Sequence, residues 1–231
     1  DRMFVYLRLD GDDNGSTDDA VQAVESSGQP VVRLGLADVY HIGAEFFHWE
    51  MATAIAGSII CINPFDQPNV QAAKDMTESV LAQFGTSGTL PDMEEAGATS
   101  QLLAMAGPGD YLAIMAYITQ SPEVDQALDD LRRRVTEKFG IATTMGYGPR
   151  FLQSTGQQHK GGPASGLFLQ ITEEHSQSRP IAGTPYSFEV LADAQALGDL
   201  QALRASERRA IRVDAGADLA SAIKNMVKEL S

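Results

Sequence analysis

Gln67 and Lys74 are two polar residues whose spacing would let them act on one ligand. They lie seven residues apart in the stretch INPFDQPNVQAAK (62–74), in which Pro68 suits the first position of a helix. Seven residues make about two helical turns, so Gln67, Lys74 and Glu78 share one flank of that helix. Because helical side chains lean toward the N-terminus, Lys74 leans back toward Gln67. We predict that both side chains contact one small polar ligand. The alternative is a lysine whose stem covers the core and a glutamine that only occupies the cap.

The glycine-rich stretch STGQQHKGGP (154–163) supplies the second group of candidates. Its glycines have the G-x-x-x-x-G spacing of a phosphate-binding loop, but Gly162 and Pro163 stand where a nucleotide-binding loop needs Lys and Ser/Thr. A nucleotide-binding function is therefore excluded. We predict a polar loop between two strands, in which the neighbouring Lys160 lowers the pKa of His159 and keeps it ready to accept a proton. A flexible turn with an exposed histidine is the alternative.

No metal site and no cofactor are predicted. The stretch DGDDNGSTDD (10–19) begins like a calcium-binding loop, but Val21 occupies the twelfth position, where a bidentate Glu is required. We expect a solvated acidic turn there. His41, His48 and His175 are expected at the surface, because no pair of histidines has the spacing of a zinc-binding helix and one cysteine cannot form a thiolate cluster.

The composition excludes two classes of partner. The 231 residues include 31 acidic and 17 basic ones, and the formal net charge of −14 opposes binding to nucleic acid or to an anionic membrane. Hydrophobic residues make up 43% of the chain, which is ample for a core in one large domain or two small ones. Cys61, the only cysteine, is expected to be a small core residue, in keeping with a reducing cytoplasm. The weakly polar run at 51–62 is too short to span a bilayer.

Strand-like and helical patterns alternate along the chain, which predicts an α/β fold, a three-layer αβα sandwich with a mainly parallel sheet. The clearest helix covers 122–138, with Ser121 as its cap and Gly140 as its end. A last helix is expected at about 216–230. The strand-like runs are 4–9, 30–36, 58–62, 111–118, 142–145, 166–172 and 210–213.

Two further helices are expected in the first half of the chain. One covers 42–57, and the other runs from Pro68 to about Phe84. The polar stretch 86–100 is expected to connect a core at 1–85 to an α/β extension at 101–231. The residues that we expect these two helices to bury are Phe47, Met51, Ala54 and Ile55 in the first, and Val70, Ala73, Thr77, Val80, Leu81 and Phe84 in the second.

The stretch GAEFFHWEMATAIAGSIICINPFDQPNVQAAK (43–74) resembles the second signature of the glucose-6-phosphate isomerase family. Phe-Asp-Gln at 65–67 and the lysine seven residues further on complete the pattern. The family usually has Gly-Val-Glu where this chain has Asn-Val-Gln at 69–71. This difference leaves the lysine in register and places Gln71 where the family has its glutamate.

The later stretch GYGPRFLQSTGQQHKGGPASGLFLQIT (146–172) resembles the C-terminal extension of the isomerase that is fused behind transaldolase in bifunctional bacterial proteins. The resemblance implies a sugar-isomerase (SIS) fold followed by that extension. The partners it implies are a sugar phosphate substrate and upstream isomerase and transaldolase domains, and we also consider a homodimer. The strand-like start without an initiator methionine leads us to expect chain upstream.

The family resemblance implies an aldose-ketose isomerisation of glucose 6-phosphate and fructose 6-phosphate. Members open the sugar ring and move a proton between C2 and C1 through a cis-enediol. By resemblance, Lys74 assists ring opening, Gln67 binds the substrate, and His159, in an H-x-x-G-x-P setting, takes part in ring opening. Ser154, Thr155 and Lys160 of the same stretch are predicted substrate-binding residues. Because the family's base and phosphate cradle lie upstream, we expect the isolated chain to be inactive. A non-catalytic sugar-phosphate-binding or interface domain is the alternative.

Overall fold

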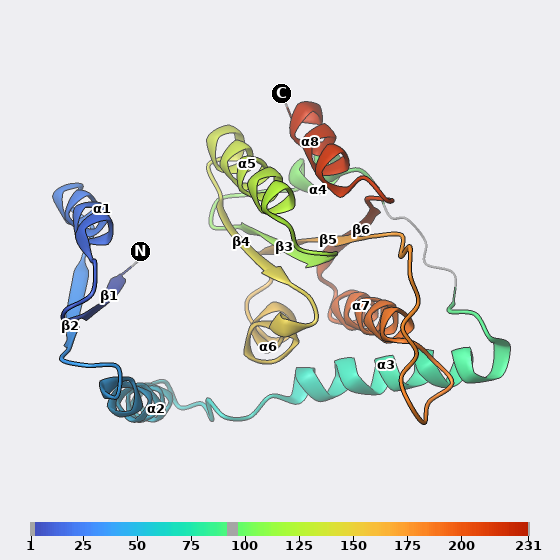
Figure 1. The fold of residues 1–231 in the computed structure, drawn as a ribbon, viewed down its shortest axis with the longest axis horizontal. Coiled ribbons are helices and arrows are strands. Elements are labelled where there is room, and N and C mark those ends of the chain that lie inside the picture. The colour runs from blue at the N-terminus through green and yellow to red at the C-terminus, as the bar shows by residue number, and fades with distance from the viewer. Residues whose placement is uncertain (1–2, 92–96, 231) are drawn as a thin grey trace. The chain divides into compact units, whose positions relative to one another are not determined.

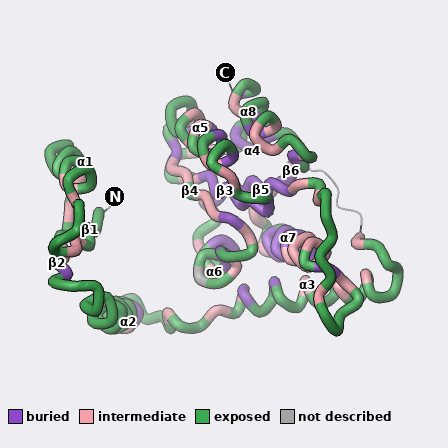
Figure 2. The backbone as a smooth tube through the Cα atoms, viewed as in Figure 1, coloured by how far each residue is buried: buried purple, intermediate pink, exposed green. Residues whose placement is uncertain are grey.

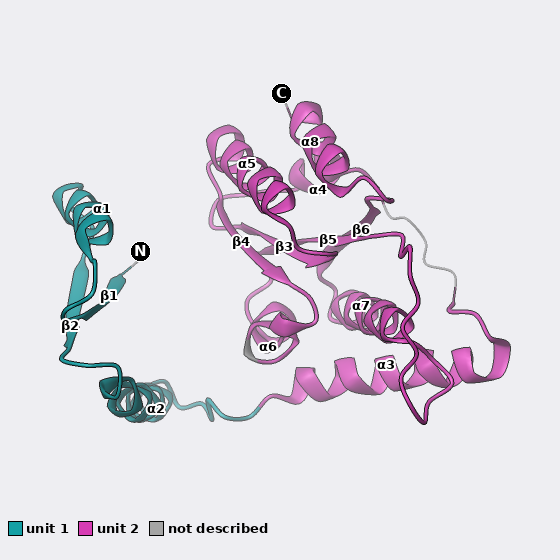
Figure 3. Ribbon diagram, viewed as in Figure 1, with its two compact units in different colours: residues 1–66 teal, residues 67–231 magenta. Residues whose placement is uncertain are grey.

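The computed structural model describes residues 3–91 and 97–230. The chain divides into two compact units, residues 1–66 and residues 67–231 (Figure 3). Each unit combines helices with a sheet whose strands are all parallel. The predicted fold class, α/β with a mainly parallel sheet, is confirmed.

The first unit contains a two-stranded parallel sheet and two helices. The acidic turn predicted at 10–19 is confirmed only for 10–14, which follow the first strand, whereas 15–19 belong to the first helix. The Tyr6 hydroxyl donates a hydrogen bond to the Asp18 carboxylate at 2.9 Å and so ties the strand to that helix. The elements are β1 (Phe4–Leu9), α1 (Gly15–Ser26), β2 (Val31–Leu36) and α2 (His41–Ile60).

Residues 58–62 are not a strand. They form the last turn of α2, which extends to Ile60, and the first residues after it. The alanine-rich segment before them favours a helix, and a short apolar run cannot by itself distinguish a strand from a helix end. The helix ends at Cys61, whose φ of 58° is left-handed, and the thiol is exposed instead of buried in a core.

The side chains that α2 was expected to bury are mostly exposed. Phe47, Met51 and Ile55 are 61%, 46% and 54% accessible. The helical spacing of the apolar residues predicted the helix correctly. The prediction that one face of the helix is buried also required a core large enough to cover that face. Two strands and one further helix provide too little apolar surface for that.

The second unit is built on a four-stranded parallel sheet with the order β4-β3-β5-β6. The central strand β5 is buried along its whole length. All four strands lie where the sequence predicts them, and β4 and β6 are slightly longer than predicted. Their bounds are β3 (Tyr111–Tyr117), β4 (Ala142–Tyr147), β5 (Gly166–Thr172) and β6 (Arg209–Asp214).

Helices cover both faces of this sheet (Figure 1). One face carries α4 (Thr99–Leu103), α5 (Pro122–Phe139) and α8 (Leu219–Glu229), which enclose the largest apolar core. The other face carries α6 (Ser154–Gly161) and α7 (Phe188–Ala205). The long helix α3 (Pro68–Ser87) packs on the outside of α7. Figure 2 shows that the buried residues concentrate in the sheet and in the inner faces of these helices.

The helix α5 confirms the clearest prediction made from the sequence. The Ser121 side chain accepts a hydrogen bond from the backbone N–H of Val124 at 3.3 Å, and Pro122 takes the first helical position. Gly140 ends the helix with a φ of 66°, a left-handed conformation that glycine adopts without strain.

The predicted connector at 86–100 is partly helical. Its first residues complete α3 and its last residues begin α4 at Thr99, whereas 92–96 lie outside the described residues. The division between the compact units falls earlier, between Asp66 and Gln67. The helix α3, which the sequence predicts as part of a core at 1–85, packs against α7 of the second unit.

Candidate functional site

Helix α3 places Lys74 in the second unit. Pro68 occupies the first helical position and Gln67 the N-cap position, as predicted from the sequence. Val70, Ala73 and Val80 are buried on the face toward the rest of the unit. Lys74 lies beside this face, with its side chain exposed.

A glycine in α7 allows α3 to come unusually close. A Cβ atom on Gly198 would lie 2.4 Å from the Oγ1 atom and 2.8 Å from the backbone nitrogen of Thr77. Contacts below about 3 Å do not occur for real Cβ atoms. The two helices therefore cross at this glycine. The crossing fixes the position of Lys74 relative to α7.

The first turn of α3 is joined to α6 by two hydrogen bonds between Asn69 and Gln157. The backbone N–H of Asn69 donates to Oε1 of Gln157 at 2.9 Å, and Nε2 of Gln157 donates to Oδ1 of Asn69 at 2.8 Å. A Cβ on Gly161 would lie 2.5 Å from that Nε2 and 2.6 Å from that Oδ1. Asn69, which stands where the isomerase family usually has glycine, thus has a structural role here.

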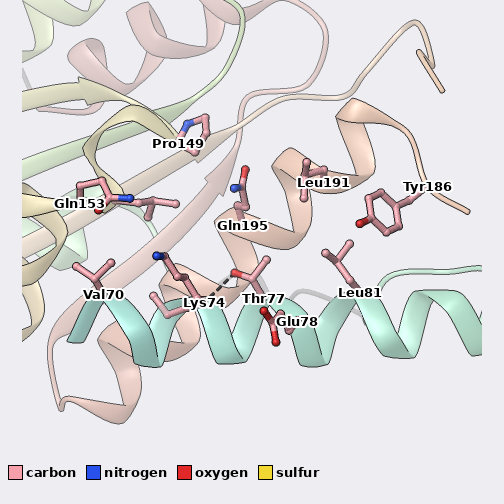
Figure 4. A pocket seen from close by; sticks show the side chains of 12 residues that line it. Val70, Lys74, Thr77, Glu78, Leu81, Pro149, Gln153, Tyr186, Leu191 and Gln195 are labelled. Carbon is pink, nitrogen blue, oxygen red and sulfur yellow. Dashed lines mark hydrogen bonds between the residues drawn. The ribbon is translucent and has the colours of Figure 1, made fainter. Parts of the chain in front are cut away.

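A pocket of about 450 Å³ lies between α3, α7 and the segment that follows β4. Small-molecule sites are typically about 300 to 1,000 Å³ and combine apolar walls with a few convergent polar groups. Figure 4 shows the side chains that line it. Its walls are formed by Val70, Ala73, Lys74, Thr77, Glu78 and Leu81 of α3, by Pro149, Leu152 and Gln153, and by Tyr186, Leu191 and Gln195.

Lys74 is the one cation among the described residues that line this pocket. No hydrogen bond or ion pair engages its ammonium group within the described parts of the chain. Its side chain extends from α3 into the space toward Gln153 (Figure 4). An uncompensated ammonium group in a pocket is able to donate hydrogen bonds to a ligand oxygen.

Gln67 and Lys74 are not brought into the same pocket. Gln67 is half-buried at the start of α3 and does not line the cavity, whereas Glu78, on the same flank as Lys74, does. The helical spacing placed Lys74 and Glu78 on one flank. Gln67 differs because, as the N-cap, it has φ −131° and ψ 62° and does not follow the helical direction.

His159 lies inside the unit and away from the pocket. The stretch that was expected to be a loop is the helix α6, and it turns His159 inward, where the residue is 4% exposed. The ring centroid lies 4.9 Å from that of Phe168 and 6.3 Å from that of Phe151. Burial, with a smaller contribution from the charge of Lys160, lowers the pKa of His159 from 6.5 to about 4. The imidazole is therefore neutral near pH 7.

Lys160 is also buried, and its charge is compensated inside the protein. Its ammonium group forms an ion pair with Asp199 of α7, and both side chains are almost fully buried. Burial raises the pKa of Asp199, and the contact with Lys160 opposes that rise. The Tyr117 hydroxyl faces the same carboxylate outside ordinary hydrogen-bond geometry, and burial raises the pKa of Tyr117 well above its usual value. This cluster joins α6 and α7 to the sheet.

The remaining predicted residues of this stretch do not line the pocket. Thr155 is exposed on α6, and the side chain of Ser154 lies outside the described part of the structure. Sequence reasoning did not single out Gln153, Tyr186 or Gln195. Gln153 directly precedes the glycine-rich stretch, which was its only signal; Tyr186 and Gln195 come from the region of α7, more than 100 residues after Lys74 in the chain.

No group of three or more His, Cys, Asp or Glu residues in the described ranges is arranged to hold a metal ion. Within the same ranges, none of the helices has the length and apolar character needed to cross a membrane.

Short parts of the chain are similar to curated glucose-6-phosphate isomerases. The protein from Exiguobacterium sibiricum is 36% identical over 55 residues, which is 24% of this chain and 12% of that protein. The protein from Rubrobacter xylanophilus is 32% identical over 74 residues (31% of this chain, 17% of that protein), and the one from Symbiobacterium thermophilum is 34% identical over 70 residues (29% and 16%). The matches span less than a fifth of the length of these relatives.

A solved structure, that of a hypothetical protein from Thermus thermophilus, aligns with 90% of this chain and 52% of its own, with 15% sequence identity and a TM-score of 0.46. No protein-family model matches the chain. The sequence matches indicate a distant relation to glucose-6-phosphate isomerase.

Proposed function

We propose that this chain is part of an aldose-ketose isomerase that acts on a sugar phosphate, with glucose 6-phosphate and fructose 6-phosphate as the substrate pair. The observation that carries the proposal is the position of Lys74, whose ammonium group has no partner within the described residues and lines a pocket of about 450 Å³. The local similarity to glucose-6-phosphate isomerases supports the choice of reaction.

In this proposal Lys74 donates a hydrogen bond to the oxygen of the sugar ring. An ammonium group placed there stabilises the negative charge that develops on this oxygen as the ring opens. Glu78, one turn further along α3, is the carboxylate of the same pocket. His159 does not have this role in our proposal, because α6 turns it toward the interior and it does not line the pocket.

The base that moves the proton between C2 and C1, and the group that binds the phosphate, are proposed to come from upstream isomerase residues. We propose that these belong to a transaldolase fusion that works in the cytoplasm, and that the 231 residues alone bind the substrate without turning it over. A homodimer is part of the same proposal. The second candidate function, non-catalytic binding of a sugar phosphate, is favoured by one observation: within the described residues, no histidine lines the pocket.

Replacing Lys74 tests the proposal. In the whole enzyme, Lys74→Ala should lower kcat by about 10²- to 10⁴-fold, the range typical of proton-transfer groups. In the 231-residue chain it should weaken binding of fructose 6-phosphate, measured by calorimetric titration. Lys228→Ala is the matched control, because Lys228 is exposed on α8 at the opposite face of the sheet. Turnover close to normal in the Lys74 variant would refute the assignment, and binding without turnover in the whole protein would favour the second candidate.

A further inference from the structure

Two glutamine side chains from the second unit reach the pocket beside Lys74. Gln153 follows the short 3₁₀ turn after β4, and Gln195 projects from the middle of α7. Lys74, Gln153 and Gln195 approach the same space from three different segments (Figure 4). Within the described chain, neither amide group takes part in a hydrogen bond, so both are available to a ligand.

The charge of the pocket is unsuited to a phosphate group. Among its described lining residues, Lys74 is the one cation, and the carboxylate of Glu78 stands one helical turn away. A phosphate dianion is usually held by several cationic or backbone N–H donors. A carboxylate in the lining, such as that of Glu78, repels the negative charge of a phosphate group.

The lining is suited to a ligand rich in hydroxyl groups. An amide both donates and accepts hydrogen bonds, as a hydroxyl does. Gln153 and Gln195 can therefore act as donor or as acceptor toward the hydroxyl groups of a polyol. The half-buried ring of Tyr186 and the side chains of Leu152 and Leu191 offer apolar surface for the C–H groups of a sugar.

We propose that Gln153 and Gln195 form, together with Lys74, a subsite that recognises the uncharged hydroxyl-bearing end of the sugar and leaves its phosphate outside the pocket. This inference rests on the proposed function, since it assigns which part of that substrate this pocket holds. The C-terminal half of the chain then contributes directly to substrate recognition. Gln153 and Gln195 are specificity-determining residues in this view.

The test compares two probes, fructose 6-phosphate and unphosphorylated fructose, by NMR titration of the 231-residue chain. Gln153→Leu and Gln195→Leu remove one amide each and should weaken binding of both probes roughly 3- to 10-fold, which is the loss of one neutral hydrogen bond. Gln158→Ala is the matched control, because Gln158 is exposed on α6 and does not line the pocket. Inorganic phosphate should not displace either probe.

A charged variant makes the test independent of lost packing. Gln195→Glu keeps the shape of the side chain and adds a negative charge to the pocket. If the phosphate lies outside the pocket, this variant should weaken the binding of fructose 6-phosphate no more than it weakens the binding of fructose. Unchanged affinity in both leucine variants, or displacement of fructose by inorganic phosphate, would overturn the subsite while leaving Lys74 as the ligand-facing residue. If the unaltered chain and Lys74→Ala both fail to bind either probe, the proposed function itself is refuted.

Discussion

His159 shows how strongly burial changes the chemistry of a single residue. Its ring packs against Phe168 and lies near Phe151, and its pKa falls to about 4. In the unfolded chain the same imidazole titrates near 6.5. Because the unfolded chain binds this proton more readily, the contribution of His159 to stability is fully present above pH 6.5. It is lost as the pH falls from 6.5 toward 4.

We therefore expect the free energy of unfolding to fall by about 2 kcal/mol between pH 7 and pH 5 through this residue alone, since one pKa unit corresponds to about 1.4 kcal/mol. Denaturant titrations at several pH values would measure this slope. His159→Leu should remove it, because leucine has no proton to bind. His48→Gln, which changes an exposed histidine, should keep the slope of the unaltered protein. Equal slopes in the His159 variant and the unaltered protein would contradict the expectation.

The flank of α3 on which Lys74 lies was predictable, and the neighbours that it receives from other segments were not. The helical repeat from Pro68 onward set the flank on which Lys74 and Glu78 lie, because it depends only on local geometry. Gln195 is near Lys74 because α7 packs across α3, and no local pattern encodes that crossing. His159 and Lys160 were read as exposed for a related reason, since their burial depends on the way α6 docks against the sheet and α7.

Helix α3 is held in place by two close contacts at separate points. The crossing at Gly198 fixes its middle, and the Asn69–Gln157 hydrogen bonds fix its first turn. Lys74 lies between these two points. The direction of its side chain therefore depends on contacts that are not part of the pocket itself.

Gly198→Ala is expected to destabilise the protein by about 1 to 3 kcal/mol, the usual cost of adding a methyl group where there is no space. The new Cβ would collide with Thr77, including its backbone nitrogen, so α3 must move away from α7. Thr77→Ala in the same protein should restore only part of the loss. Urea unfolding would provide the measurement.

Gly85→Ala is the matched control for this variant. Gly85 also lies in α3, and a Cβ there would meet no atom within 4 Å. Alanine has the higher helix propensity, so this change should stabilise the protein by up to about 1 kcal/mol. A Gly198 variant as stable as the unaltered protein would show that α3 is not clamped at the crossing.

Sequence reasoning at the level of elements succeeded where local signals agree. The Ser121 cap, Pro122 and Gly140 all specify the bounds of α5, and the structure has the helix between them. The apolar run at 58–62 had no comparable start or end signal, and it continues α2. Helix α6 was missed because its glycines suggested a loop, although they serve close packing at Gly161.

The apolar core is distributed very unevenly over the two units. Within the described ranges, the clusters of buried apolar side chains consist of residues from the second unit. In the described part of the first unit, the buried residues are Tyr6, Leu36 and Gly57, and α2 exposes Phe46, Phe47 and Ile59 among others. Because burial of apolar surface is the main source of stability, the second unit should be by far the more stable one.

We expect residues 67–231 alone to fold cooperatively and to bind the same sugar probes as the whole chain, because the pocket and its walls lie entirely within them. Near-ultraviolet circular dichroism and the denaturant midpoint of this fragment should match those of the second unit in the whole chain.

Residues 88–231, which lack α3, are the control. Without α3 they expose Ala194 and Leu197, which Val80 covers, and they should be less stable and bind no sugar. Residues 1–66 alone should bind a hydrophobic dye. If 67–231 remained unfolded until 1–66 was added, the stability of the pocket would depend on the first unit, and Lys74 would have to be studied in the whole chain.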